Sequence, residues 1–150
     1  VRSGKWYFEV EVLEGRRLMQ IGWCAADATF SVRGGHGCGD DPHSWSWCGH
    51  RLRKFHGDGG SDVDVRGYGD SPWNDGDVVG AYLDADAGVI SFTRNGTALG
   101  VCHSGVVTTG AGFYPALSFS RGRGAVVHYG AGGAAPRYPP EDPAYRPVAA

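Results

Sequence analysis

The sequence has few of the residues that build amphipathic helices. Lysine occurs only twice, glutamate is scarce, and no ten-residue window repeats apolar residues at the i, i+3, i+4, i+7 spacing of a helix face. Glycine, by contrast, occurs 26 times, without the period of collagen, between short apolar runs. Such a composition favours many short strands joined by many turns. The sequence therefore predicts an all-β protein.

Long apolar runs and a strong charge of either sign are also absent. No run approaches the ~18 residues of a membrane span, and no signal peptide is visible. A formal net charge of −2 argues against a general nucleic-acid binder, because such domains are strongly basic. The 150 residues are enough for one domain, and the strand-like opening after Val1 predicts a monomeric piece of a longer chain. We expect neither nucleic-acid nor membrane partners, and a cytoplasmic location, with the nucleus as the alternative.

The four cysteines show no C-x-x-C pair and no regular spacing, which is not typical of a disulfide framework. We expect free thiols in a reducing compartment. Cysteines and histidines do gather between His36 and His56, which raises zinc as an alternative, but their spacing matches no recognised zinc framework. We predict no metal and no cofactor.

Period-2 alternation of apolar and polar side chains marks the strands expected at residues 5–13 and 44–55, and other short apolar runs are also expected to be strands. The stretches concerned are residues 5–13, 18–24, a strand pair within 44–55, 78–84, 88–96, 97–102, 113–120 and 125–130. About nine short strands without helices predict two packed antiparallel sheets. Long glycine-rich loops before and after the 44–55 pair are of a length that usually binds something. A proline-rich segment, residues 134–150, should run extended over the domain formed by residues 1–133 or leave it.

The stretch D-A-D-A-G, Asp84 to Gly88, looks at first like a cation-binding loop. A calcium loop needs six to eight oxygen ligands and, in the EF-hand, a glutamate at position twelve, where this chain has Asn95. Aspartate and glycine also favour turns. We predict a turn here and a type I′ hairpin turn at Asn95-Gly96.

Six stretches occur in the order found in SPRY domains, and the chain resembles that family over nearly its whole length. They are GKWYFEVEV, MQIGWC, GDDPHSWSW, WNDGDVVGAYLDADAGVISFTRNGTALGV, FYPALSFS and VVHYG. The resemblance implies a bent β-sandwich with long loops at one edge and a non-catalytic role in holding partner proteins or peptides. RYPPEDPAYRPV is similar to the segment after the SPRY domain of RING-type ubiquitin ligases of the Kip1-ubiquitination-promoting kind, with Ala144 in place of glycine. Ryanodine-receptor SPRY domains are the next most similar group.

The resemblance also places the loop around GDDPHSWSW and the turn after FYPALSFS at one binding edge. Arginine suits such an edge, because its planar fork can hold a carboxylate or backbone carbonyls through two bonds. We expect a partly exposed ring at Trp45 or Trp47. The expected partner-binding residues are Arg33, His36, Asp41, Trp47, Arg53, Arg121 and Arg123. The chain has glycine and Arg121 where the SOCS-box class of SPRY domains has tyrosine and tryptophan, so the Asn-rich peptide specificity of that class is not transferred.

Three functions follow as hypotheses. The first is partner or substrate recognition in a ubiquitin ligase. The second is a structural SPRY domain packed inside a large assembly, such as a calcium channel of the ryanodine-receptor type. The third, a hydrolase, is disfavoured because the sequence has no G-x-S-x-G elbow.

Overall fold

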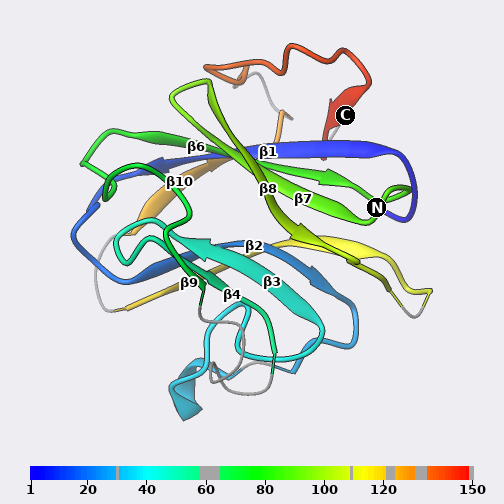
Figure 1. The fold of residues 1–150 in the computed structure, drawn as a ribbon, viewed down its shortest axis with the longest axis horizontal. Helices are drawn as coiled ribbons and strands as arrows, with labels where there is room; N and C mark the ends of the chain where they lie inside the picture. The colour runs from blue at the N-terminus through cyan, green and yellow to red at the C-terminus, as the bar shows by residue number, and fades with distance from the viewer. Residues whose placement is uncertain (30, 58–64, 109, 121–123, 131–134, 149–150) are drawn as a thin grey trace.

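Two β-sheets pack face to face in the computed structural model (Figure 1), which describes residues 1–148 apart from 30, 58–64, 109, 121–123 and 131–134. Sheet A has the strand order β10-β1-β6-β7-β8, with β11 also pairing with β1, and sheet B has the order β5-β4-β3-β2-β9. The strands are β1 (Lys5–Val12), β2 (Met19–Ala25), β3 (Ser44–Cys48), β4 (Arg53–Phe55), β5 (Val65–Arg66), β6 (Val78–Asp84), β7 (Val89–Arg94), β8 (Thr97–Ser104), β9 (Phe113–Phe119), β10 (Ala125–His128) and β11 (Tyr145–Pro147). One 3-10 turn, η1 (Val32–Gly34), interrupts the loop between β2 and β3.

This architecture confirms the predicted all-β sandwich, with all nine predicted strands in place. Two strands were not predicted, β5 and β11, which are two and three residues long. Strand β11 comes from the proline-rich segment and pairs in parallel with Lys5–Tyr7 of β1, whereas the other pairings are antiparallel. That segment thus contributes to sheet A as well as running over the surface.

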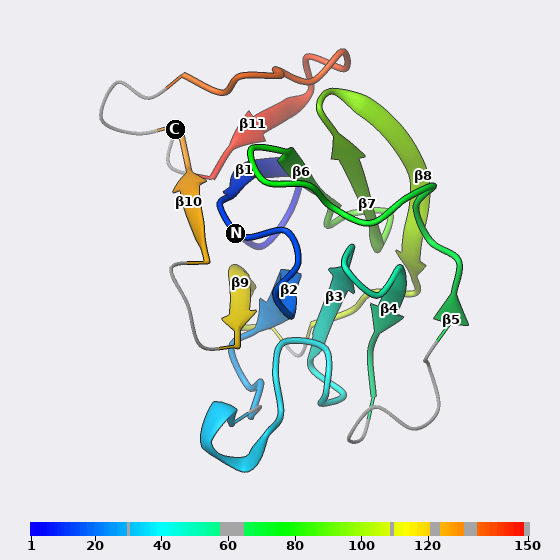
Figure 2. The same cartoon turned by 90° about the vertical axis from the view of Figure 1, so that its left-hand side faces the viewer.

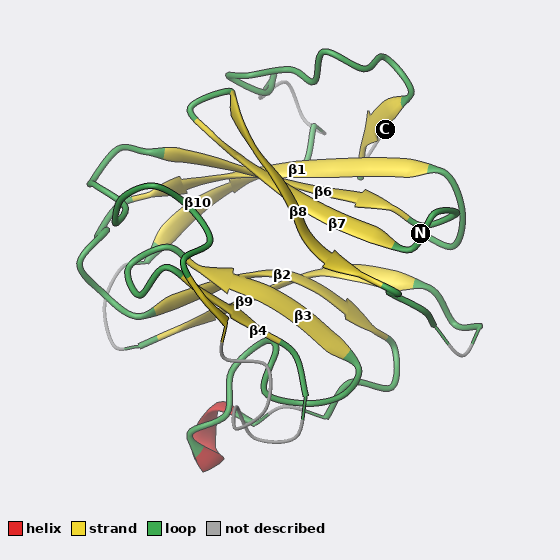
Figure 3. Ribbon diagram, viewed as in Figure 1, coloured by secondary structure: helices red, strands yellow, loops and turns green. Residues whose placement is uncertain are grey.

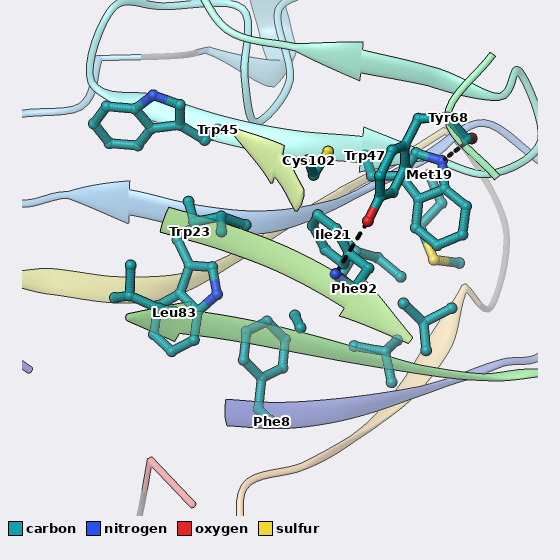
Figure 4. Packing of buried hydrophobic residues seen from close by; sticks show 14 of the residues in the cluster. Phe8, Met19, Ile21, Trp23, Trp45, Trp47, Tyr68, Leu83, Phe92 and Cys102 are labelled. Atoms are coloured by element: carbon teal, nitrogen blue, oxygen red, sulfur yellow. Dashed lines mark hydrogen bonds between the residues drawn. The ribbon is translucent and has the colours of Figure 1, made fainter. Parts of the chain in front are cut away.

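The core lies between the two sheets and is rich in aromatic rings (Figure 4). Alternate residues of β1, from Phe8 to Val12, point into it and are buried. From sheet B, the ring of Trp23 meets Phe8 edge-on at a centroid distance of 5.2 Å. Tyr68 links the layers, because its hydroxyl accepts a bond from the Phe92 N–H (3.2 Å) and donates one to the Gly100 carbonyl (2.7 Å).

The opposite face of β1 is buried as well, which the alternation did not predict. Tyr7 and Glu9 are 4% and 1% exposed, although they alternate with the core residues. The reason is the segment 135–148, which lies over the outer face of sheet A (Figure 1).

The two predicted turns of the β6–β7–β8 meander are confirmed. Asp84 and Val89 end and begin strands, and the Asp84 carboxylate accepts a bond from the Ala87 N–H at 2.9 Å. Asn95 and Gly96 have φ angles of 50° and 81°. Two consecutive positive φ angles are the signature of a type I′ turn.

All four cysteines are free thiols, and burial raises the pKa of the Cys38 thiol well above its ordinary value. Within the described residues, no group of three or more His, Cys, Asp or Glu side chains is placed to hold a metal ion. The same part of the chain contains no helix with the length and apolarity needed to cross a membrane.

Candidate functional site

The loop between β2 and β3, residues 26–43, folds back over the outer face of sheet B, the face turned away from sheet A (Figure 2). The Cys38 N–H donates to Ser118 Oγ of β9 at 2.9 Å, and Ser46 Oγ of β3 donates to the Cys38 carbonyl at 2.6 Å. A Cβ added to Gly37 would lie only 1.9 Å from Gln20 Oε1 of β2. The β2–β3 loop is therefore in close contact with three strands.

This contact explains why both faces of β3 are buried. The alternation of Trp45 and Trp47 with Ser44 and Ser46 predicted one apolar and one polar face, and all four residues are buried. The serine hydroxyls bond to the loop rather than to water: Ser44 Oγ accepts from the Gly39 N–H at 2.7 Å. The polar face of β3 thus serves to hold the loop.

Asp41 is the main polar anchor of the β2–β3 loop. Its carboxylate, 5% exposed, accepts hydrogen bonds from the Thr29 N–H, from Ser44 Oγ and from the His43 N–H. Burial by itself would raise the pKa of Asp41, but the bonds from Ser44, Thr29 and His43 lower it below its ordinary value. The carboxylate is buried and engaged within the loop, which does not fit the prediction that Asp41 contacts a partner directly.

Replacing Asp41 with alanine should loosen the β2–β3 loop while the sandwich stays folded. This carboxylate accepts several hydrogen bonds, and the loop groups that lose them can bond to water once the loop opens, so the cost falls on the loop rather than on the sandwich. We expect faster hydrogen exchange at the Cys38 and Gly39 amides. Asp86→Ala, at an exposed turn position, is the matched control. Unchanged protection of both amides in Asp41→Ala would contradict this role.

Arg33 and His36 lie at the outer end of the loop, and both are exposed. Arg33 belongs to η1, the red turn in Figure 3, which stands away from the sheets. The Gly34 and His36 amides bond to the Ser31 carbonyl at 2.9 and 3.0 Å, which closes the turn. Two of the predicted site residues therefore share one ordered and accessible structure.

Trp47 is a core residue, and its burial does not fit the prediction that it contacts a partner. It has no exposed surface, its ring lies 4.9 Å from that of Trp73, and its Nε1–H donates to the Tyr68 carbonyl at 3.0 Å. Trp45 is only 3% exposed, so the expectation of a partly exposed ring at either position also fails. Residues two apart in a strand point to the same face, and here that face is the one between the sheets.

Arg53 lies on β4, half-buried, opposite Cys48 of β3. The β2–β3 loop reaches the same strand, because a Cβ on Gly39 would lie 2.6 Å from the Phe55 side chain. The guanidinium of neighbouring Arg51 stacks over the Phe55 ring at 4.8 Å. Arg53 therefore lies on the same outer face as the loop anchors. The remaining predicted residues, Arg121 and Arg123, lie outside the described residues.

Sequence reasoning missed Tyr114 on β9. Its side chain is 49% exposed, on the outer face of sheet B, where it pairs with Cys24 at the end of β2. The β2–β3 loop starts two residues after Cys24, so Tyr114 lies next to the beginning of the loop. Nearby, His43 Nδ1 lies 3.4 Å from an Asp27 carboxylate oxygen. The alternation in FYPALSFS contains the signal, since Phe113 points inward and the next residue must point outward.

A hollow of about 310 Å³ lies elsewhere, beside the D-A-D-A-G turn between β6 and β7. Its charged lining residues are Arg2 and Asp86, both exposed. The hollow is lined partly by Val107, which is 74% exposed. It is open to solvent and separate from the β2–β3 loop.

Comparisons with known proteins agree with this geometry. The model of the SPRY domain family matches residues 5–132. The E3 ubiquitin-protein ligase RKP of Arabidopsis thaliana is 36% identical over 131 residues, which cover 86% of this chain and 10% of that protein. The probable ATP-dependent RNA helicase ddx1 of Dictyostelium discoideum is 31% identical over 117 residues, 78% of this chain and 13% of that protein. The chain thus spans about a tenth of the length of these relatives. It belongs to the SPRY domain family.

Proposed function

We propose that this domain holds a partner protein on the surface formed by the β2–β3 loop, and that it serves substrate recognition in an E3 ubiquitin ligase. The observation that carries the proposal is the loop itself, which is anchored by buried hydrogen bonds and presents Arg33 and His36 to solvent. SPRY domains are non-catalytic interaction modules, and the ligase RKP contains a region 36% identical to this chain.

The chemistry of the surface fits protein recognition. Arginine and tyrosine are enriched among the residues that dominate binding energy at interfaces, and Arg33 and Tyr114 are the accessible examples here. A loop ordered before binding loses less entropy when a partner docks. The guanidinium of Arg33 suits a carboxylate or backbone carbonyls of an extended segment. The free thiols fit the cytoplasm, where we place the domain.

The test compares affinity capture by three forms of the domain. The variant Arg33→Ala/His36→Ala/Tyr114→Ala should lose the partner that the natural sequence retains, by about tenfold or more, since hot-spot residues cost 2 kcal/mol or more each. Its unfolding free energy should change by less than about 1 kcal/mol, because the three side chains are on the surface. The control Arg16→Ala/Arg17→Ala removes two exposed charges from the β1–β2 turn. Equal capture by the triple variant would rule out this surface.

A second function is favoured by the lengths of the relatives. Because the chain matches only 10–13% of each, most of each relative lies outside the SPRY region and can pack against it. The β2–β3 loop would then contact another domain of the same polypeptide. Cross-linking of the full-length parent protein at position 36 decides between the two functions: cross-links within one chain support packing, and cross-links to a second protein support partner recognition.

A further inference from the structure

The C-terminal segment, residues 135–148, binds to the outer face of sheet A through a buried carboxylate. Glu9 is 1% exposed, and its two oxygens accept bonds from the backbone N–H groups of Arg137 (2.7 Å) and Tyr138 (2.8 Å). Prolines at positions 136 and 139 flank these two donors. Glu9 therefore recognises two consecutive backbone N–H groups of an extended, proline-rich chain.

Side chains of the C-terminal segment also contact the domain. Arg137 Nη2 lies 2.9 Å from a Glu11 carboxylate oxygen, and the Tyr138 ring packs against Gly96, where an added Cβ would approach it to 2.9 Å. Lys5 Nζ lies 2.8 Å from an Asp142 oxygen, and the Arg146 guanidinium is 4.4 Å from the Trp6 ring. These contacts select for arginine and tyrosine at defined positions along the segment.

The face beneath the segment is costly to expose. Tyr7 and Tyr82 stack with ring centroids 5.6 Å apart and are 4% and 7% exposed. The Tyr145 ring meets Tyr82 edge-on at 5.1 Å. Removing the C-terminal segment would expose the rings of Tyr7 and Tyr82 and leave the Glu9 carboxylate without its two hydrogen-bond donors. Exposing the rings and losing the bonds both cost free energy.

The side chains of the C-terminal segment are held by interactions that are individually weak. Arg137, Tyr138 and Arg146 are exposed, and exposed ion pairs contribute little. Strand β11 has only three residues and pairs in parallel with Lys5–Tyr7, the part of β1 that β10 does not pair with. Opening of the segment exposes Tyr7, Tyr82 and Glu9, but it leaves the core between the sheets intact, so it costs less free energy than unfolding of the core strands.

We propose that this outer face of sheet A is a second peptide-binding surface, occupied in the structure by residues 135–148, and that a proline-rich segment of a partner protein with Arg-Tyr-Pro and Tyr-Arg-Pro elements can replace them. Proline-rich chains are extended before binding, so they lose little entropy on docking. A replacing segment can pair with Lys5–Tyr7 of β1 as β11 does, which supplies backbone bonds to any such segment. This surface is separate from the β2–β3 loop, which lies on sheet B.

The test uses the full chain with Arg137→Ala/Arg146→Ala, which weakens the binding of its own residues 135–148 to sheet A. The ligand is a fluorescent synthetic peptide with the sequence of residues 135–148. The tethered segment competes at an effective concentration of roughly millimolar. The peptide should therefore bind the variant about tenfold more tightly than it binds the natural chain, given the loss of two exposed contacts. A peptide with the same two alanines is the control and should bind the variant about tenfold more weakly than the natural peptide does. Equal binding of both peptides, or no saturable binding, would overturn the proposal.

Hydrogen exchange of the natural chain gives an independent test that needs no variant. The Arg137 and Tyr138 amides should exchange at least about tenfold faster than core amides such as that of Phe92, because the segment opens without unfolding of the sandwich. Exchange of these amides only through global unfolding would show that the segment is a fixed part of sheet A, which overturns the proposal.

Discussion

Replacing Gly22 with alanine is expected to prevent the chain from folding. Gly22 lies on β2 opposite Ser46 of β3, and a Cβ at this position would lie 1.8 Å from the Trp45 carbonyl oxygen. The clashing atom is backbone, so it cannot move aside without breaking the β2–β3 pairing. We expect a loss of at least about 5 kcal/mol, which is comparable with the whole stability of a small domain.

Circular dichroism and urea unfolding of the purified variant measure this effect. Gly34→Ala is the matched control, because its nearest neighbour would be His36 at an ordinary contact distance of 3.4 Å. It should unfold within about 0.5 kcal/mol of the natural chain. A folded Gly22→Ala variant with an unchanged urea midpoint would mean that the two strands are not so close.

Trp47→Ala is expected to lower the free energy of unfolding by about 3–5 kcal/mol, the usual cost of deleting a buried aromatic side chain. The indole meets the rings of Tyr68, Trp73 and Phe92 at centroid distances of 5.4, 4.9 and 5.5 Å. Its removal also leaves the Tyr68 carbonyl without the bond from Nε1–H.

The matched control is Tyr114→Ala, an aromatic deletion on the surface of the same sheet. It should change stability by less than about 1 kcal/mol. The two variants distinguish effects on stability from effects on binding. We expect Tyr114→Ala to weaken partner capture without loss of stability, and Trp47→Ala to lower the free energy of unfolding. The assignment of Trp47 to the core fails if its alanine variant keeps the natural urea midpoint and loses the partner.

Local patterns predicted the strands and turns because those features depend on neighbouring residues. Alternation in residues 5–13 reports that Phe8, Val10 and Val12 face the core, and Asn95-Gly96 needs only its own φ angles. Strand β11 depends instead on pairing between Tyr145 and Lys5, far apart in the chain. Its three residues are too few to show a period.

The candidate site was predicted less well, for the same reason. The sequence identified the β2–β3 loop from its length and composition, and the resemblance to SPRY domains led to Arg33 and His36 within it. It did not show that the loop folds onto sheet B, so Asp41 looked accessible although it is buried. The alternation around Trp47 showed that its ring shares a face with Trp45, but not that this face is sealed by Tyr68 and Trp73.

In the β2–β3 loop, the residues that anchor it to the domain are different from the residues that it exposes to solvent. Its fixed points are Thr29 at one end and residues 38–41 at the other, all bonded to groups within the domain. The residues around η1 contribute little to these bonds. Their identities can therefore change during evolution, or in a designed library of binders, at little cost in stability. Under the proposed function, the domain would be a framework for exchangeable recognition sequences, comparable with the hypervariable loops of an antibody.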